Sequence, residues 1–378
     1  MRIPAIVLVA ELLSKNKVSE GRLPVTVVTG FLGSGKTTLL RHLLSEGNQR
    51  LAVVVNEFGT VGLDGDLLKN CGLCPDDEVD ERIVELNNGC LCCTVQEDFL
   101  PAMEALLLRS NQLDGIIIET SGLALPKPLL QALNWPAIRS KVFINGVVTL
   151  VDGYALSNGS PVGDLKSIKE QMTNDNSIDH ITPIDELFRD QLISADLVLV
   201  SRSDLLTAKD FSLVKEEVKK RGNSNANLLP ISNGIIEPSV ILGLCKEENN
   251  IYRLDQNDHD HDHDHDHDHD HDHDHDHVDV ISDHLRMETP IDQDVLREMF
   301  LRLVPEYQIL RVKGKCWIEG KALPLQIQMV GSRFNSWFEA ANENAWQPRQ
   351  SGIDIVFLSL REGVKEAVEN SLFLSTSK

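Results

Sequence analysis

The chain has 378 residues, of which 42% are hydrophobic and 25% charged, a composition typical of two or three folded domains. No apolar stretch approaches the roughly 20 residues that cross a bilayer, so we expect no membrane-spanning segment and no membrane partner. The formal net charge of −22 argues against a general nucleic-acid-binding protein, which would need a basic surface.

The cysteines and the first residues bear on localisation. Three of the seven cysteines crowd into residues 90–93, a spacing that suits thiolate metal ligands better than disulfide bonds. We therefore expect a reducing, cytoplasmic compartment. Residues 1–10 are apolar like a signal peptide, but Glu11 follows directly and no small-residue cleavage site is clear. Residues 1–22 are interpreted as an N-terminal extension.

Elements of two kinds alternate along the next 220 or so residues. Short apolar runs predict buried strands at 24–29, 51–55, 115–119, 146–151 and 196–200. Helical patterns lie between several of them, for example at 38–44, 95–109 and 184–193. This alternation predicts an α/β domain with a mainly parallel sheet, which we place at residues 23–245.

The remainder of the chain divides into two segments. Residues 246–284 contain a strict Asp-His repeat at 258–277, and this repeat has no apolar side chain to bury. The segment is therefore predicted to be a disordered, metal-binding linker. Hydrophobic content returns at 285–378, where we expect a small α+β domain. Its predicted elements are a helix at 291–304 and strands at 308–318, 325–330 and 353–358.

A phosphate-binding loop follows the first predicted strand. Residues 30–37 match G-x-x-x-x-G-K-[ST], with a strand before and a helix after, as phosphate binding requires. Glycines let backbone N–H groups approach phosphate oxygens, Lys36 supplies positive charge, and the Thr37 hydroxyl is a ligand for Mg²⁺. The nucleotide-binding residues predicted here are Gly30, Gly33, Ser34, Gly35, Lys36, Thr37 and Thr38.

Two acidic residues at strand ends extend this site. Glu119 precedes Thr-Ser-Gly122, so its carboxylate can hold Mg²⁺ while Gly122 approaches the terminal phosphate. Glu57 follows the second strand, and ligands of open parallel sheets bind at the carboxyl ends of strands. We assign catalytic roles to Lys36, Glu57 and Glu119. The alternative is that each acid is a solvated side chain at a strand end.

A base-reading element is expected after a later strand. Asp204 can accept two hydrogen bonds from the guanine edge, and the planar guanidinium of Arg202 can stack on the base. Taken alone, this pattern is a weak signal. A helix-capping role is the alternative for Asp204.

Two further features suit metal ions. Cys90, Cys92 and Cys93 precede a predicted helix, whose N-terminus favours thiolates, and thiolates bind Zn²⁺ and Co²⁺. Buried or redox cysteines are the alternative, and a separate pair, Cys71 and Cys74, either adds ligands or is incidental. The Asp-His repeat offers imidazoles for weak metal collection, unless it is only a solvated linker.

These motifs, in their order along the chain, resemble the CobW family of metal-handling P-loop GTPases. The resemblance covers roughly residues 24–360 and rests on the segments Val25 to Leu39, Asn56-Glu57-Phe58-Gly59, Asn88 to Cys93 and Glu119 to Ala124. Asn134-Trp135-Pro136 and residues 184–192 are similar to the cobalamin branch of the family.

The resemblance implies a GTP-hydrolysing metallochaperone that binds GTP with Mg²⁺ and carries a metal ion on the C-x-C-C thiolates. In the cobalamin branch the implied cargo is Co²⁺ and the client a cobaltochelatase, so we rank Co²⁺ first and Zn²⁺ second. Ser201 departs from the asparagine of the family's Asn-Lys-x-Asp motif, which weakens the case for guanine selectivity. A non-enzymatic metal buffer and a P-loop kinase are the alternatives.

Overall fold

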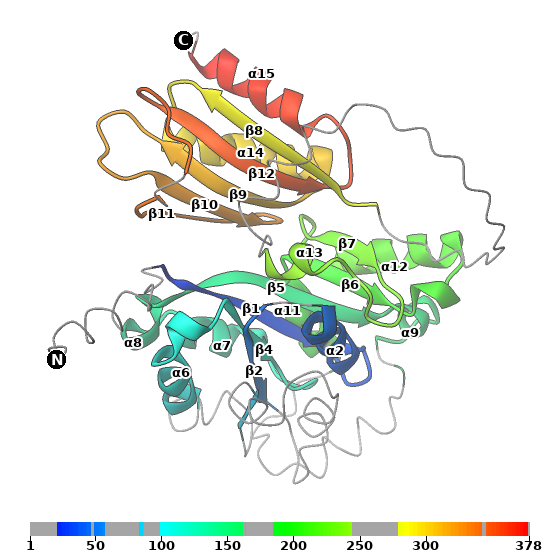
Figure 1. Ribbon diagram of the computed structural model, residues 1–378. Coiled ribbons are helices and arrows are strands. Elements are labelled where there is room, and N and C mark those ends of the chain that lie inside the picture. Colours follow the sequence, from blue (N-terminus) through cyan, green and yellow to red (C-terminus); the bar gives the residue numbers. More distant parts are fainter. Residues whose placement is uncertain are drawn as a thin grey trace, which may run out of the picture.

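The computed structural model of the protein describes residues 21–46, 49–56, 83–86, 99–161, 163, 184–243, 279–341 and 345–376. Two β-sheets with their helices make up this part of the chain, the first from residues before 244 and the second from residues after 278 (Figure 1). None of the described helices is long and apolar enough to cross a membrane.

The first sheet has seven strands in the order β3-β2-β4-β1-β5-β6-β7, and every described pair is parallel. The strands are β1 (Leu23–Gly30), β2 (Leu51–Asn56), β3 (Ile83–Leu86), β4 (Gly115–Glu119), β5 (Val142–Asp152), β6 (Leu197–Ser201) and β7 (Asn227–Pro230). The predicted α/β fold with a mainly parallel sheet is confirmed.

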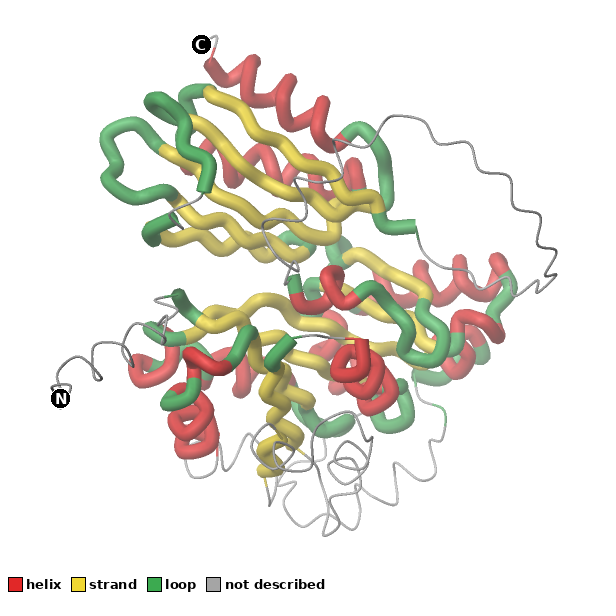
Figure 2. Tube along the Cα trace, in the orientation of Figure 1, coloured by secondary structure: helices red, strands yellow, loops and turns green. Residues whose placement is uncertain are grey.

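Helices cover both faces of this sheet (Figure 2). They are α2 (Lys36–Glu46), α6 (Leu100–Leu107), α7 (Pro126–Ala132), α8 (Pro136–Arg139), α9 (Gly153–Ser157), α11 (Ile184–Ile193), α12 (Ala208–Arg221) and α13 (Pro238–Leu242). Because strand side chains alternate, Val27 packs with α6, α7 and α8, whereas Val28 packs with α2 and α13 on the opposite face.

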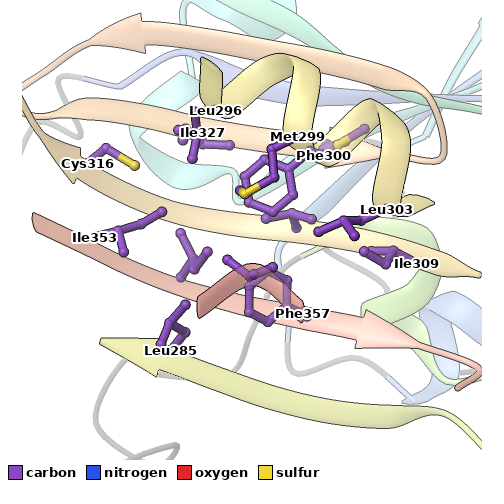
Figure 3. Close-up of a cluster of buried hydrophobic side chains, with 14 of the residues drawn as sticks. Leu285, Leu296, Met299, Phe300, Leu303, Ile309, Cys316, Ile327, Ile353 and Phe357 are labelled. Carbon is purple, nitrogen blue, oxygen red and sulfur yellow. The ribbon is translucent and has the colours of Figure 1, made fainter. Parts of the chain in front are cut away.

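The second sheet is antiparallel, in the order β11-β10-β9-β12-β8. Its strands are β8 (Ile281–Glu288), β9 (Ile309–Trp317), β10 (Leu325–Val330), β11 (Arg333–Phe338) and β12 (Gly352–Ser359), and its helices are α14 (Gln293–Tyr307) and α15 (Val364–Thr376). Phe300, Met299 and Leu303 of α14 pack against buried side chains of the sheet (Figure 3). This is the small α+β unit predicted for the C-terminal residues.

Several elements differ from the sequence prediction. β8 begins at Ile281, inside the range assigned to the linker, because Ile281 pairs with Ser359 of the distant β12. β5 begins at Val142 rather than residue 146. The Asn145-Gly146 pair looks like a turn in the sequence, but here it forms a bulge, at which the register with β1 shifts. α6 is described from Leu100 to Leu107, so it ends two residues before the predicted end.

A buried arginine joins the two sheets. Arg311 of β9 is 6% exposed and donates its Nε to the Val240 carbonyl at 2.5 Å, with Nη2 donating to the Ile241 carbonyl. Its Nη1 donates to the Oδ1 atom of Asn145 at 3.0 Å, and Asn145 in turn donates to the Thr26 hydroxyl at 2.8 Å. The bulge in β5 therefore places one amide between the C-terminal sheet and β1.

A second polar contact joins β11 to the first sheet. Arg333 donates its Nε to the buried Asp196 carboxylate at 2.6 Å, and the Val147 backbone N–H donates to the same oxygen at 2.8 Å. Burial raises the pKa of Asp196, although the charge and hydrogen bond of Arg333 oppose that rise. Asn335 also donates to the Ile144 carbonyl at 3.0 Å. Directional bonds therefore fix how the two sheets meet.

Removal of the Arg311 side chain should destabilise the protein strongly, because buried carbonyl groups and the Asn145 amide would lose a charged donor. We expect Arg311→Ala to lower the free energy of unfolding by about 2–4 kcal/mol, measured by urea denaturation. Arg302→Ala is the matched control, since Arg302 donates to Ser371 at an exposed position and should cost less than about 0.5 kcal/mol. Equal losses in the two variants would contradict this account.

Candidate functional site

The predicted phosphate loop leaves the sheet at the end of β1 through three glycines with positive φ. Gly30, Gly33 and Gly35 have φ values of 136°, 73° and 100°, which residues with a Cβ rarely adopt. A Cβ at Gly30 would also collide with the Leu150 carbonyl of β5. The loop therefore turns close against the neighbouring strand, and only glycine allows that path. Phe31 anchors it by packing on Phe188 of α11, with ring centroids 5.9 Å apart.

The loop presents an arrangement that suits a bound phosphate. Lys36 is 8% exposed, and its Nζ donates to the carbonyls of Gly30 and Phe31 at 2.9 and 3.1 Å. Ser34 Oγ is buried and has no hydrogen-bond partner within the described part of the chain. A buried hydroxyl without a partner is costly, so an anion at this position would satisfy it. The residues present therefore fit the phosphates of a nucleotide at the start of α2.

The end of β4 lies beside this loop. Glu119 is opposite Val28 of β1 in the parallel register and is 2% exposed. Thr120 ties the two strand ends together, because its hydroxyl donates to the Thr29 hydroxyl at 2.8 Å and its N–H to the Val28 carbonyl at 2.9 Å. Glu119 thus lies next to the phosphate loop, where its role as a Mg²⁺ ligand stays a prediction.

Gly122 contacts the phosphate loop directly. A Cβ at this position would be 2.5 Å from the Leu32 backbone nitrogen. The segment is held from the other side by Gln191 of α11, whose Nε2 donates to the carbonyls of Gly122 and Ala124 at 3.2 Å each. Sequence reasoning missed Gln191, because a polar residue in a helix gives no local sign that it is fully buried.

The predicted base-reading turn follows β6. Arg202 has left-handed backbone angles (φ 55°, ψ 34°), and its Nη1 donates to the Asp152 carboxylate at 2.5 Å. Asp204 accepts a hydrogen bond from the Ser232 hydroxyl at 2.7 Å. Ser201, where the family motif has asparagine, donates its hydroxyl to the Val151 carbonyl at 3.2 Å. Arg202 and Asp204 are therefore both held by side chains of neighbouring elements.

The helix-capping alternative for Asp204 does not hold. The following helix, α12, is capped by Thr207, which forms a capping box with Asp210. The Asp204 carboxylate instead faces Ser232 in the loop after β7. That loop also packs on α2, because a Cβ at Gly234 would lie 2.9 Å from the Thr38 carbonyl and from the Leu39 nitrogen. It joins the base-reading turn to the start of the phosphate-loop helix.

Sequence reasoning missed the two residues that bind this turn, Asp152 at the end of β5 and Ser232 in the loop after β7. Both follow apolar strand residues, the same signal that identified Glu119 and Asp204. Asn233, next to Ser232, has a φ of 52°, which marks a sharp change of chain direction there.

Several predicted site residues lie outside the described part of the chain: Glu57, Cys71, Cys74, Cys90, Cys92, Cys93 and the Asp-His repeat. Within the described residues, no group of three or more His, Cys, Asp or Glu side chains is arranged to hold a metal ion. The cysteine described there, Cys316, is buried in the C-terminal core, and burial raises the pKa of its thiol well above the usual value. Cys316 is therefore a packing residue of the C-terminal core.

The contact between Gly122 and the phosphate loop gives a test of the site. Gly122→Ala should weaken Mg–nucleotide binding tenfold or more, because the new methyl group must displace the Leu32 backbone; binding of a fluorescent nucleotide measures this. Gly320→Ala is the control. Gly320 has a φ of 76° and open space around it, so the variant should cost only about 1 kcal/mol of stability. Unchanged nucleotide affinity in Gly122→Ala would contradict the geometry.

Comparison with known proteins places this geometry in a family. Residues 24–230 match the model described as CobW/HypB/UreG, nucleotide-binding domain, and residues 280–372 match the Cobalamin synthesis protein cobW C-terminal domain. The chain is 38% identical over 360 residues to a protein of Sinorhizobium sp named Zinc chaperone CobW, covering 94% of this chain and 98% of that protein.

Two further relatives support the same family assignment. A Pseudomonas aeruginosa protein, also named Zinc chaperone CobW, is 44% identical over 320 residues, covering 84% of this chain and 83% of that protein. The Schizosaccharomyces pombe protein named Zinc-regulated GTPase metalloprotein activator 1 is 35% identical over 201 residues, or 52% of this chain and 43% of that protein. With its phosphate loop and acidic strand end as described, the chain belongs to the CobW/HypB/UreG family of P-loop GTPases.

Proposed function

We propose that this protein hydrolyses GTP and uses the hydrolysis cycle to bind a divalent metal ion and deliver it to a client protein. The observation that carries the proposal is the shared edge of the first sheet. There the phosphate loop, Glu119 and the Asp204 turn stand at the carboxyl ends of β1, β4 and β6 of one parallel sheet. That edge is where open parallel sheets bind nucleotides.

The proposed roles follow from the contacts of each residue. Lys36 exchanges the carbonyls of Gly30 and Phe31 for phosphate oxygens, and the N–H groups at the start of α2 bind the same anion. Thr37 and Glu119 are the oxygen ligands that would hold Mg²⁺, which supplies positive charge beside the phosphates. Glu57 remains a proposed member of this site from its place directly after β2.

Guanine is the proposed base. A carboxylate fixed by one hydroxyl keeps lone pairs to accept the N–H groups that guanine, unlike adenine, presents on its edge. The missing asparagine at Ser201 should cost about 1 kcal/mol, whereas the charged acceptor Asp204 should be worth about 2–3 kcal/mol. The carboxylate therefore outweighs the departure from the family motif.

Zinc now ranks ahead of cobalt as the proposed cargo. The sequence resemblance favours Co²⁺ first, but the Sinorhizobium and Pseudomonas aeruginosa relatives are both named zinc chaperones. The proposed ligands Cys90, Cys92 and Cys93 suit either ion. They follow β3, whose carboxyl end lies beside that of β2 in the parallel pair. The client is accordingly proposed to be a zinc metalloenzyme, with a cobaltochelatase as the client if the cargo is Co²⁺.

Base selectivity tests the nucleotide half of the proposal. The unmodified protein should bind GTP more tightly than ATP, and Asp204→Ala should abolish the difference, measured by competition against a fluorescent nucleotide. Glu216→Ala, an exposed acid on α12, is the control and should leave the preference intact. Equal affinities for GTP and ATP in the unmodified protein would remove the support for guanine.

Metal binding tests the other half. Titration of Zn²⁺, and of Co²⁺ followed by its thiolate absorption, should show tighter binding with GTP–Mg²⁺ than with GDP–Mg²⁺ or no nucleotide, because an ordered nucleotide loop preassembles the thiolates. Reciprocity then requires the metal to tighten GTP binding by the same factor, typically about 5–150-fold.

Two variants separate the sites in that titration. Lys36→Ala should remove the coupling and keep metal binding, whereas Cys92→Ala should remove high-affinity metal and keep basal GTP binding. Three superimposable isotherms would instead favour a metal buffer, in which the thiolates and the Asp-His repeat store ions without nucleotide control.

A further inference from the structure

The carboxylate of Asp152 occupies an unusual position at the end of β5. Its side chain is 5% exposed, which makes an unpaired charge costly. One oxygen accepts the Ala155 backbone N–H at 3.1 Å, at the first turn of α9, and the other accepts Arg202 Nη1 at 2.5 Å. None of the roles described above uses this carboxylate.

Its partner is the half-exposed arginine of the base-reading turn. The side chain of Arg202 is 47% exposed, although one edge of its guanidinium is bound to a buried acid. Asp152 lies directly opposite Ser201 in the parallel pair of β5 and β6, one residue before Arg202. The backbone of Arg202 is left-handed, a conformation that residues with a Cβ rarely adopt. Arg202 is in this conformation where its side chain reaches Asp152 of β5.

The turn after β6 is thus held from two sides. β6 lies between β5 and β7 in the sheet. Asp152, from the β5 side, binds Arg202, and Ser232, from the β7 side, binds Asp204. Gly163 packs beside the first pair, since a Cβ there would lie 3.2 Å from the Asp152 carboxylate and 3.8 Å from Arg202 Nη1.

We propose that Asp152 is a positioning residue for binding of the nucleotide base. Its carboxylate holds the Arg202 guanidinium in an orientation in which the flat face of the guanidinium can stack on a purine. The proposal rests on the base site put forward above. A free arginine side chain has many rotamers, and fixing one of them before the ligand arrives reduces the entropy lost on binding. A planar guanidinium can bind a carboxylate through one edge and keep its faces for stacking, which a lysine ammonium cannot do.

A purely structural role is the competing explanation, because Asp152 also caps α9. The two roles are separable by substitution. Asp152→Asn keeps a side-chain oxygen for the Ala155 N–H but removes the charge that holds Arg202, whereas Asp152→Ala removes both. Structural damage alone would weaken the binding of every ligand of the site, including a ligand that has no base.

The test uses the full-length protein and competition against a fluorescent guanine nucleotide with Mg²⁺. Four proteins are compared: the unmodified chain, Asp152→Asn, Arg202→Ala and the double variant. Each is titrated with GTP, ATP and inorganic tripolyphosphate. We expect Asp152→Asn to weaken GTP binding about fivefold or more, leave tripolyphosphate binding unchanged, and have no further effect once Arg202 is alanine.

Three outcomes would overturn the positioning role: an unchanged GTP affinity in Asp152→Asn, an equal loss for GTP and tripolyphosphate, or a loss that persists in the Arg202→Ala background. If Asp152→Asn does not fold, Arg202→Ala decides alone, since a GTP affinity equal to that of the unmodified chain would exclude base contact by Arg202. Equal GTP and ATP affinities in the unmodified protein would instead contradict the guanine assignment, and the Asp152–Arg202 cycle would still report on stacking.

Discussion

Parallel pairing of β1 with β4 on one side and β5 on the other is the constraint on which the nucleotide site depends. The register sets Val28 opposite Glu119 and Gly30 opposite Leu150, so three strands end together. Parallel strands all point their carboxyl ends to one edge, and the loops that leave them share that edge. The same closeness leaves no room for a Cβ at Gly30. Strand pairing and phosphate-loop geometry are therefore one requirement.

The two halves of the site are built by different means. In the phosphate loop, the backbone forms most of the site, because its glycines and the start of α2 set the path of the chain. In the proposed base-reading turn, side chains fix the geometry, since Arg202 and Asp204 are each held by a partner on a neighbouring element. Backbone N–H groups suit phosphate, which is charged and nearly symmetrical, whereas a base is recognised by directional contacts to its edge and face.

β5 links this edge to the C-terminal sheet. Its bulge at Asn145 lies in the polar contact with Arg311, and its last residue, Asp152, binds Arg202. Burial of Arg311 and Asp196 at the interface costs desolvation, which the bonds to carbonyls, amide and Arg333 offset. An interface made this way accepts few alternative dockings, because a shifted sheet would leave buried charges without partners.

The sequence by itself determined the family and located the phosphate loop, the acid at the end of a strand at Glu119 and the turn that carries Asp204, because each depends on residues close together in the chain. The roles of Glu119 and Asp204 stay predictions. Glu57 and the three cysteines at 90–93 were also inferred in that way and stay predictions. Only the tertiary structure decided the partners of these residues. Asp152 and Arg202 are 50 positions apart, and Asn145 and Arg311 are 166 apart. The local periodicity of a sequence indicates which face of a helix or strand is apolar. It does not indicate which distant side chain the register of the sheet will place opposite a given residue.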